Sequence, residues 1–197
     1  MNSSSIRDNF SNGTVGEFLE SCISSQSDVS IVSAYFTIYA YSYLKNNLDK
    51  INSLRFLFGE PTFIKSMDPD KTNVRDFKIE DDKLVIPIES RLVQKNIAKE
   101  CSAWIKNKTE IRSMVRPNFL HGKMYYVRQE SGIEKAITGS SNFTVNGLGL
   151  GERKNIELNI IIDSDRDRRE LREWFDEIWD DKTGMVEDVK EQVLKYL

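Results

Sequence analysis

Apolar positions along the chain switch repeatedly between the helical period of 3.6 residues and short, almost continuous apolar runs. Such switching is typical of an α/β domain, in which amphipathic helices pack against strands that are buried on both faces. The helical period predicts helices over residues 14–25, 37–49, 93–105, 171–179 and 186–196. The apolar runs predict strands over residues 28–36, 54–59, 110–115, 121–128, 134–139 and 155–163. We therefore expect a mixed, mostly buried β-sheet flanked by helices on both faces.

Local signals refine several of these boundaries. Thr14 and Glu17 have the spacing of a capping box, and residues 130–133 have the composition of a hairpin turn. The polar residues 60–82 are expected to form a loop or an irregular segment. Residues 84–88 are predicted as a short edge strand, because their proline cannot donate a ladder hydrogen bond. With no internal repeat and no interdomain linker, the 197 residues are expected to form a single domain.

The composition excludes several classes of protein. Hydrophobic residues make up 39% of the chain and charged residues 30%, which is typical of a globular protein in water. No apolar run approaches the length that a membrane-spanning helix needs. The first ten residues lack the basic start and the apolar stretch of a secretory signal, so the cytoplasm is the expected compartment.

Few residues could hold a metal ion or form a disulfide. The two cysteines, Cys22 and Cys101, are far apart in the chain, and His121 is the only histidine. A zinc site would therefore need carboxylates or a second chain to complete it. We expect a chemistry that uses neither a metal nor another cofactor.

Positive charge is concentrated in one segment although the net charge is −3. Residues 91–128 contain nine Lys or Arg residues and two Glu residues, a local charge of +7. Such a segment can guide a nucleic-acid backbone, but it can equally form the solvated face of a helix. The candidate nucleic-acid-binding residues are Lys95, Lys99, Lys106, Arg112 and Arg116.

Three short stretches carry candidate chemistry. In a strand, residues two apart point to the same face, so a strand over 121–128 places His121 beside Lys123. A structural histidine with a chance lysine neighbour is the alternative. The second stretch runs from Gly139 through Ser140 to Asn142 at the end of a predicted strand, where small residues and neutral donors suit phosphate oxygens. An ordinary polar turn is the alternative there.

The third stretch is NIELNIII, residues 155–162, in which Glu157 interrupts an apolar strand. A carboxylate in a buried strand is costly unless it is paired. Pairing with His121 would fix the tautomer of the imidazole and make its other nitrogen a better nucleophile. A structural ion pair with Arg153 or Arg116 is an equally good alternative on this evidence.

Together the three stretches resemble the phospholipase D superfamily, whose motif is His-x-Lys, then Gly-Ser-x-Asn, then an acidic residue on the next strand. Here the motif is H121-G-K123, G139-S-S-N142 and E157. The stretches FTVNGL (143–148) and EWFDEIW (173–179) resemble the nuclease branch of that family. The similarity to the family also covers the stretch SIVSAYF (30–36). Many members carry Asp five residues after the Lys, where this chain has Arg128; this departure argues more against a lipase than against catalysis.

The resemblance implies a phospholipase D-like α/β/α sandwich and metal-independent cleavage of a phosphodiester through a phosphohistidine on His121. Lys123, Asn142 and Ser140 are then expected to hold the phosphate oxygens, and Glu157 to orient His121.

The chemistry needs two such motifs, so a single-copy chain implies a homodimer with the site at its interface. Nucleic acid, with DNA first, is the expected substrate. The alternatives are a phospholipid-cleaving enzyme and a non-catalytic nucleic-acid-binding or dimerisation module. By family analogy the chain is also expected as the N-terminal part of a larger helicase or restriction protein.

Overall fold

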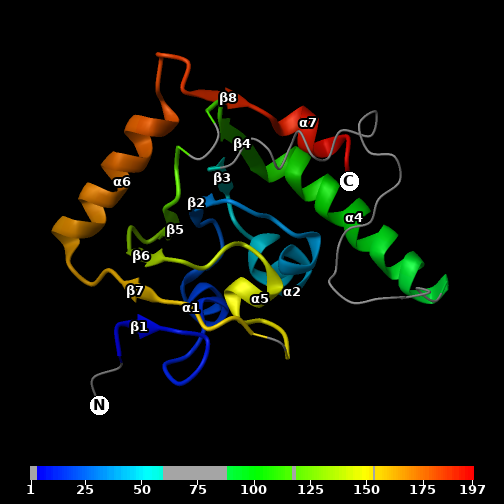
Figure 1. The fold of residues 1–197 in the computed structure, drawn as a ribbon, viewed down its shortest axis with the longest axis horizontal. Helices are drawn as coiled ribbons and strands as arrows, with labels where there is room; N and C mark the ends of the chain where they lie inside the picture. The colour runs from blue at the N-terminus through cyan, green and yellow to red at the C-terminus, as the bar shows by residue number, and fades with distance from the viewer. Residues whose placement is uncertain (1–3, 60–87, 117–118, 153) are drawn as a thin grey trace.

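The computed structural model describes residues 4–59, 88–116, 119–152 and 154–197. Their strands form one eight-stranded mixed sheet with the order β1-β7-β6-β5-β2-β3-β4-β8 (Figure 1). The strands are β1 (Ile6–Arg7), β2 (Asp28–Ser33), β3 (Ser53–Phe58), β4 (Thr109–Met114), β5 (Lys123–Arg128), β6 (Glu134–Gly139), β7 (Asn159–Ile161) and β8 (Val186–Asp188). The fold class expected from the sequence, a mixed buried sheet between helices, is confirmed.

The strand directions bring distant parts of the sequence to one edge of the sheet. Strands β2, β3 and β4 are parallel, whereas β5 runs antiparallel to β2, and β6 and β7 continue the antiparallel pattern. The carboxyl ends of β2, β3, β4 and β6 therefore lie at the same edge as the amino ends of β5 and β7. We call it the motif edge; its strand-terminal residues are Ser33, Phe58, Met114, Lys123, Gly139 and Asn159.

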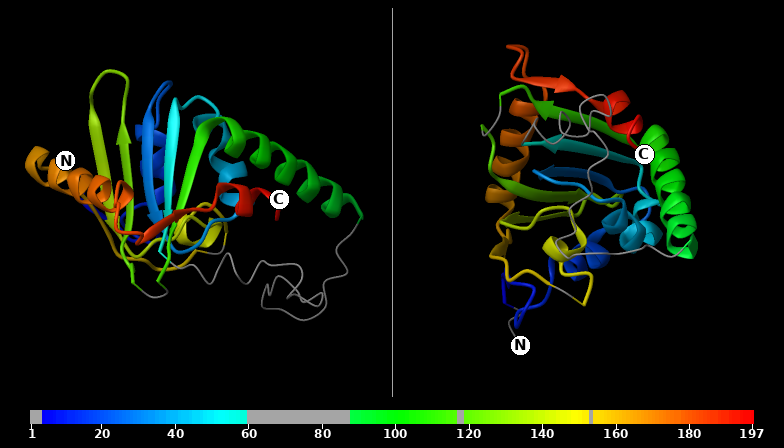
Figure 2. Two further views of the ribbon diagram at one scale, coloured as in Figure 1. Left: turned by 90° about the horizontal axis from the view of Figure 1, so that it is seen from above. Right: turned by 45° about the vertical axis from the view of Figure 1, so that its right-hand side comes forward.

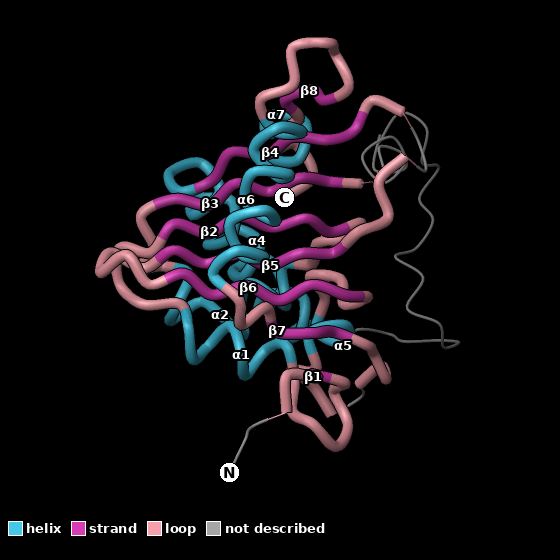
Figure 3. The backbone as a smooth tube through the Cα atoms, turned by 90° about the vertical axis from the view of Figure 1, so that its left-hand side faces the viewer, coloured by secondary structure: helices cyan, strands magenta, loops and turns pink. Residues whose placement is uncertain are grey.

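Helices cover both faces of the sheet, as Figures 2 and 3 show. One face, called here the α2 face, packs against α1 (Val15–Cys22), α2 (Ile38–Leu48), α4 (Ile88–Lys108), α5 (Val145–Leu148) and α7 (Lys190–Leu194). The other, the α6 face, packs against α6 (Asp165–Trp179). Ile31 is buried in the first core and its neighbour Val32 in the second. Burial on both faces explains why the strand sequence is continuously apolar rather than alternating.

The capping box predicted at the start of the first helix is confirmed. Thr14 caps α1: its side chain accepts from the backbone of Glu17, while the Glu17 carboxylate accepts from the backbone N–H of Thr14 at 2.8 Å. Thr37, where no cap was predicted, caps α2 by accepting from the backbone N–H of Ala40, without a reciprocal side-chain bond. These caps satisfy backbone donors that the first helical turn leaves unpaired. The hairpin over 130–133 is also present, and Gly132 supplies its positive φ of 84°.

The helix predicted over residues 186–196 is correct only in part. Val186 begins strand β8, which pairs antiparallel with β4, and only Lys190–Leu194 are helical. The free edge of β4 offers backbone groups that a strand can satisfy and a helix cannot, so pairing overrides the helical spacing. The expected loop over 60–82 and edge strand over 84–88 lie outside the described residues, except that Ile88 begins α4.

Three strands are shorter than the apolar runs predict. The strand predicted over 28–36 ends at Ser33, and the other two differences affect the candidate site. The strand predicted over 121–128 begins at Lys123, so His121 precedes it. The strand predicted over 155–163 contains only Asn159–Ile161, so Glu157 also precedes its strand. Among the described residues, no helix combines the length and the apolar composition needed to cross a bilayer.

Candidate active site

Asn142 is held by the end of strand β2. It follows β6 by three residues, and its Oδ1 accepts a hydrogen bond of 3.1 Å from the backbone N–H of Ala34 and one of 3.2 Å from the hydroxyl of Ser33. The next backbone N–H, of Phe143, donates to Ser33 Oγ at 2.9 Å. These contacts fix the plane of the amide. Its Nδ2 has no hydrogen-bond partner within the described part of the chain, so it remains available as a donor to a ligand.

Lys123 lies beside this loop because of the sheet register. As the first residue of β5 it is paired with Gly139, the last residue of β6, and its backbone carbonyl accepts from the Thr138 hydroxyl at 2.8 Å. Its Nζ donates to the backbone carbonyl of His121 at 2.9 Å. An ammonium has three protons, so this bond leaves others for an anion. Lys123 is thereby directed to the motif edge.

His121 is exposed and lies in the loop that enters β5. Close backbone packing positions this loop: a Cβ on Gly59, just after β3, would collide with the carbonyl oxygen of Leu120. On its other side Gly122 lies against the ring of Trp174 in α6, with 3.9 Å between the ring and the position of a Cβ. The loop is therefore held between the end of β3 and α6, and the imidazole is accessible at the motif edge.

Glu157 does not make the predicted contact with His121. Its carboxylate accepts from the hydroxyl of Ser140 and, at 3.3 Å, from the side-chain amide of Asn155. Within the described residues it forms no ion pair with Arg116 either, and Arg153 lies outside them. Because Glu157 precedes β7 and is only half-buried, its charge needs no buried partner. In this structure Glu157 anchors the Ser140 loop and not the imidazole.

The same contacts change the expectation for Ser140. Its hydroxyl donates to Glu157 and accepts from the backbone N–H of Leu158 at 3.0 Å, while its own N–H donates to the Leu158 carbonyl at 3.1 Å. A Cβ on Gly139 would collide with that carbonyl, so only glycine permits so close an approach of the two segments. The Ser140 hydroxyl is thus committed to positioning the loop, and Lys123 and Asn142 carry the free donors.

A buried layer supports the loop after β6, and the sequence patterns did not reveal it. The Tyr125 hydroxyl donates to the carbonyl of Ser141 at 2.8 Å. Asn159 accepts from the Ser141 N–H at 3.1 Å and donates to the Ser141 hydroxyl at 2.9 Å and the Arg7 carbonyl at 3.0 Å. Burial raises the pKa of Tyr125 well above its ordinary value, and the nearby charge of Glu157 adds to the effect. One sequence feature could have revealed this layer: Ser33 and Asn159 are polar residues inside otherwise apolar strands.

The five candidate nucleic-acid-binding residues do not form one continuous surface. Lys106 lies in the last turn of α4, which enters β4 at the edge opposite the motif edge. Arg112 packs over the Trp179 ring at 4.8 Å and donates to its carbonyl, so it ties β4 to α6. Lys95 and Lys99 are exposed one turn apart on α4, and Arg116 is exposed over the Phe119 ring at 5.4 Å.

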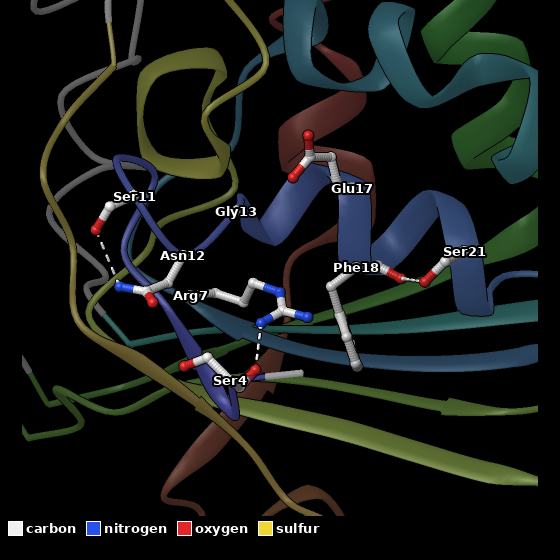
Figure 4. A pocket seen from close by; sticks show the side chains of 8 residues that line it. All are labelled: Ser4, Arg7, Ser11, Asn12, Gly13, Glu17, Phe18 and Ser21. Atoms are coloured by element: carbon white, nitrogen blue, oxygen red, sulfur yellow. Dashed lines mark hydrogen bonds between the residues drawn. The ribbon is translucent and has the colours of Figure 1, made fainter. Parts of the chain in front are cut away.

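A separate hollow of about 470 Å³ lies near the N-terminus (Figure 4). Its polar groups are largely engaged within the chain: the Arg7 guanidinium donates to the carbonyl of Ser4 at 2.6 Å, and Glu17 completes the cap of α1. It contains none of the motif residues. Among the described residues, no three His, Cys, Asp or Glu side chains gather closely enough to hold a metal ion.

Comparison with known proteins identifies the family of the chain. The family model described as "Cardiolipin synthase, PLD-like domain" matches residues 19–179, a span that includes all three motif stretches. The chain therefore belongs to this PLD-like family within the phospholipase D superfamily, whose members are generally phosphodiesterases. A solved structure of polyphosphate kinase from Porphyromonas gingivalis aligns with 88% of the chain at 8% identity and a TM-score of 0.48. The aligned part is 20% of that protein, so this chain spans about a fifth of its length. No curated protein matches the chain.

Proposed function

We propose that the chain is a metal-independent phosphodiesterase that cleaves nucleic acid, with DNA as the first candidate substrate. One observation carries the proposal: the motif edge gathers an exposed imidazole, a lysine ammonium and an oriented amide donor from two segments, the start of β5 and the loop after β6. His121, Lys123 and Asn142 provide these groups. A nucleophile beside two donors for anionic oxygens is the arrangement that phosphoryl transfer requires.

The proposed reaction has two steps. In the first, a ring nitrogen of His121 attacks phosphorus, the bond to the leaving oxygen breaks, and a general acid gives that oxygen its proton. In the second, the same group, now a base, takes a proton from water, whose oxygen attacks phosphorus and releases the histidine. Lys123 and Asn142 hold the nonbridging oxygens throughout, which stabilises charge that develops in each transition state. The net change is hydrolysis of one ester bond.

This scheme needs a second proton-transferring group, and the chain has only one histidine. Glu157 is engaged with Ser140 and Asn155 and is therefore a poor substitute. A second copy of the chain supplies the missing imidazole if two motif edges face each other across a two-fold axis. We therefore propose a homodimer with one shared site.

Local charge supports nucleic acid as the substrate. Lys95 precedes the end of α4 by 13 residues, about 20 Å of helix, so Lys95 and Lys99 lie away from the Lys106 end. With Arg116, which follows β4 at the motif edge, they are the proposed phosphate contacts. Lys106 and Arg112 are not among the proposed contacts, because Lys106 lies near the opposite edge of the sheet and Arg112 is engaged with Trp179. Such contacts read no bases, so cleavage should depend little on sequence.

The test is a cleavage assay on supercoiled plasmid and on a single-stranded oligonucleotide, each with and without EDTA. We expect activity that survives EDTA and is lost in His121→Ala and Lys123→Ala. Lys135→Ala, at an exposed position of β6 far from the motif edge, is the matched control and should keep full activity. Activity that requires added divalent metal, or that persists without His121, contradicts the proposal.

Phospholipid cleavage is the second candidate, and the family description, which names cardiolipin synthase, is the observation that favours it. Turnover of cardiolipin or phosphatidylglycerol vesicles without cleavage of DNA would establish this alternative. A third outcome, nucleic-acid binding that is unchanged in His121→Ala with no turnover of any diester, would indicate a non-catalytic module. Additional helicase or recognition domains in a longer protein remain part of the proposal by family analogy.

A further inference from the structure

Three exposed tyrosines lead from the motif edge along α2. Tyr35, Tyr39 and Tyr43 are 49%, 40% and 56% exposed, and successive members are four residues apart in the chain. Tyr39 and Tyr43 belong to α2, whereas Tyr35 precedes the helix at its motif-edge end. Residues four apart in a helix lie on one face, about 6 Å from each other along the axis. We call these three residues the tyrosine row.

The packing of α2 does not require the two helical rings of the row. The helix packs against the sheet through other side chains, among them Tyr41, Leu44 and Leu48, which are buried. Within the described part of the chain, the side chains of Tyr39 and Tyr43 have neither a hydrogen-bond partner nor a stacked ring. An exposed ring contributes little to folding, because its faces stay in contact with water. The faces of both rings are therefore available to a ligand.

The row is joined to the candidate site through the backbone. Ala34, whose N–H holds the Asn142 amide, immediately precedes Tyr35. Two residues after Tyr35, the backbone N–H of Thr37 donates to the carbonyl of Phe143 at 3.1 Å. The start of α2 is thus fixed to the same loop that presents Asn142. A chain-like ligand held at Asn142 can therefore continue onto the row.

The charges around the row suit a polyanion. Residues 29–48 contain no Asp or Glu, although these acids make up 31 of the 197 residues of the chain. Lys45, the only charged residue of α2, contacts Glu100 of α4 at 3.6 Å, so the two helices lie side by side. The same helix α4 carries Lys95 and Lys99. A strand whose bases stack on α2 therefore has basic side chains on the neighbouring helix for its phosphates.

The spacing of the rings selects an unpaired strand. In a duplex the bases of each strand follow one another every 3.4 Å, and their faces are covered by their neighbours. Rings about 6 Å apart cannot reach such faces without unstacking the duplex. A single strand can instead lay one base on each ring, and this contact is tolerant of sequence because every base has a π-face.

We propose that the tyrosine row binds single-stranded nucleic acid by base stacking, so that the motif edge receives unpaired strands in preference to duplex. The inference rests on the proposed function, because a phosphodiester site at the end of the row is what selects nucleic acid as the occupant. Tyr35 takes the base nearest to the reacting phosphate, and Tyr39 and Tyr43 take bases farther along the strand.

The experiment measures binding by fluorescence anisotropy in a His121→Ala background, in which the probe is not cleaved. The probes are a labelled DNA strand of about 20 nucleotides, its duplex, and an abasic strand of equal length and charge. We expect Tyr39→Ala/Tyr43→Ala to weaken binding of the single strand at least about tenfold, and to change binding of the other two probes less than about twofold. Tyr39→Phe/Tyr43→Phe keeps both rings and should bind the strand as the parent does. Ile133→Ala, at an exposed position of the β5–β6 hairpin opposite the motif edge, is the matched control and should change nothing.

Three results overturn the inference. The first is single-strand binding that the double alanine variant retains, or that the parent lacks. The second is an equal loss for the normal and the abasic strand, which would show that the rings do not contact bases. The third is binding of a hexasaccharide in place of the strand, which would show that the row stacks on sugar rings.

A small diester separates this surface from the catalytic proposal. Bis(4-nitrophenyl) phosphate is too short to extend from the motif edge along α2, so its turnover should be unchanged in Tyr39→Ala/Tyr43→Ala with His121 present. Strand binding that depends on the rings, in a protein that cleaves no diester, removes the proposed function and leaves the surface. Normal cleavage of the small diester, with strand binding indifferent to the rings, removes the surface and leaves the function.

Discussion

The side-chain amide of Asn142, in the loop after β6, is fixed to the end of β2, where its Oδ1 accepts a hydrogen bond of 3.1 Å from the backbone N–H of Ala34. A backbone donor cannot rotate away, so the contact determines which end of the amide faces outward. The consequence is that Nδ2, a neutral donor, is presented at the motif edge near Lys123. Orientation of this kind, set before any ligand binds, is what makes a donor effective in catalysis.

Asn142→Asp tests this orientation with almost no change of shape. The carboxylate keeps an acceptor for Ala34 but replaces the outward donor with a negative oxygen, which repels a phosphate. We expect diesterase activity to fall by about 10²–10³-fold, the usual effect of losing one oriented donor. Hydrolysis of bis(4-nitrophenyl) phosphate measures it, and the melting temperature checks the fold. Activity within threefold of wild type would show that Asn142 does not contribute to the site.

Asn159→Ala tests the buried layer below the loop. Its amide bonds to Ser141 and to the Arg7 carbonyl while being almost fully buried, so alanine leaves several polar atoms without partners. We expect a loss of about 2–3 kcal/mol in the free energy of unfolding, measured in urea. Asn146→Ala, at an exposed position, should change it by less than about 0.5 kcal/mol. Equal effects of the two substitutions would show that the buried network contributes no stability.

Thiol reactivity should report the fold directly. Burial raises the pKa of both Cys22 and Cys101 to about 12, so both thiols stay protonated in the native protein at pH 8. We expect almost no reaction with Ellman's reagent until urea is added, when two thiols per chain react. Because the folded pKa lies above the unfolded value of about 8.5, stability is retained below that pH and falls as the pH rises toward 12, by about 1.4 kcal/mol per thiol per pH unit. Rapid reaction of either cysteine in native buffer would contradict the described burial.

Lys99 and Arg112 should behave differently although both belong to the basic segment. Lys99→Ala removes an exposed charge from α4 and should weaken DNA binding uniformly across sequences. The slope of the logarithm of the binding constant against the logarithm of the salt concentration should fall in magnitude by about 1. Arg112→Ala removes the contact with Trp179 and should instead cost about 1–3 kcal/mol of stability. Binding isotherms at several salt concentrations and urea unfolding separate the two effects. A larger loss of DNA affinity in Arg112→Ala than in Lys99→Ala would reverse these assignments.

The sequence predicted the sheet and most helices well because strands buried on both faces, such as β2, leave continuous apolar runs, and because the cap at Thr14 is a local signal. It failed at Val186, where the open edge of β4 decided the outcome, since strand pairing depends on residues distant in sequence. The sequence was enough to locate the motif residues, but it did not predict which hydrogen bonds their side chains form. Glu157 bonds to Ser140 instead of His121 because short loops before β5 and β7, and not the strands themselves, carry these residues.

The basic segment shows a similar limit of reasoning from sequence. Nearness in the chain suggested one surface from Lys95 to Arg116, yet α4 and β4 run in opposite directions and separate Lys106 from the motif edge. The exposure of the apolar side chains in and just before β7 gave no sequence signal for the same kind of reason. Ile156, Leu158 and Ile160 look like core residues in the sequence, and only the position of α6 shows that they are uncovered.

The most direct test of the central claim is subunit mixing. Wild type and His121→Ala chains are unfolded together in equal amounts, refolded, and assayed for diester cleavage. If one site uses an imidazole from each of two chains, only dimers of two wild-type chains are active, and activity falls to about one quarter of that of wild type alone. Activity of about one half, the value for chains that act independently, would contradict the shared site.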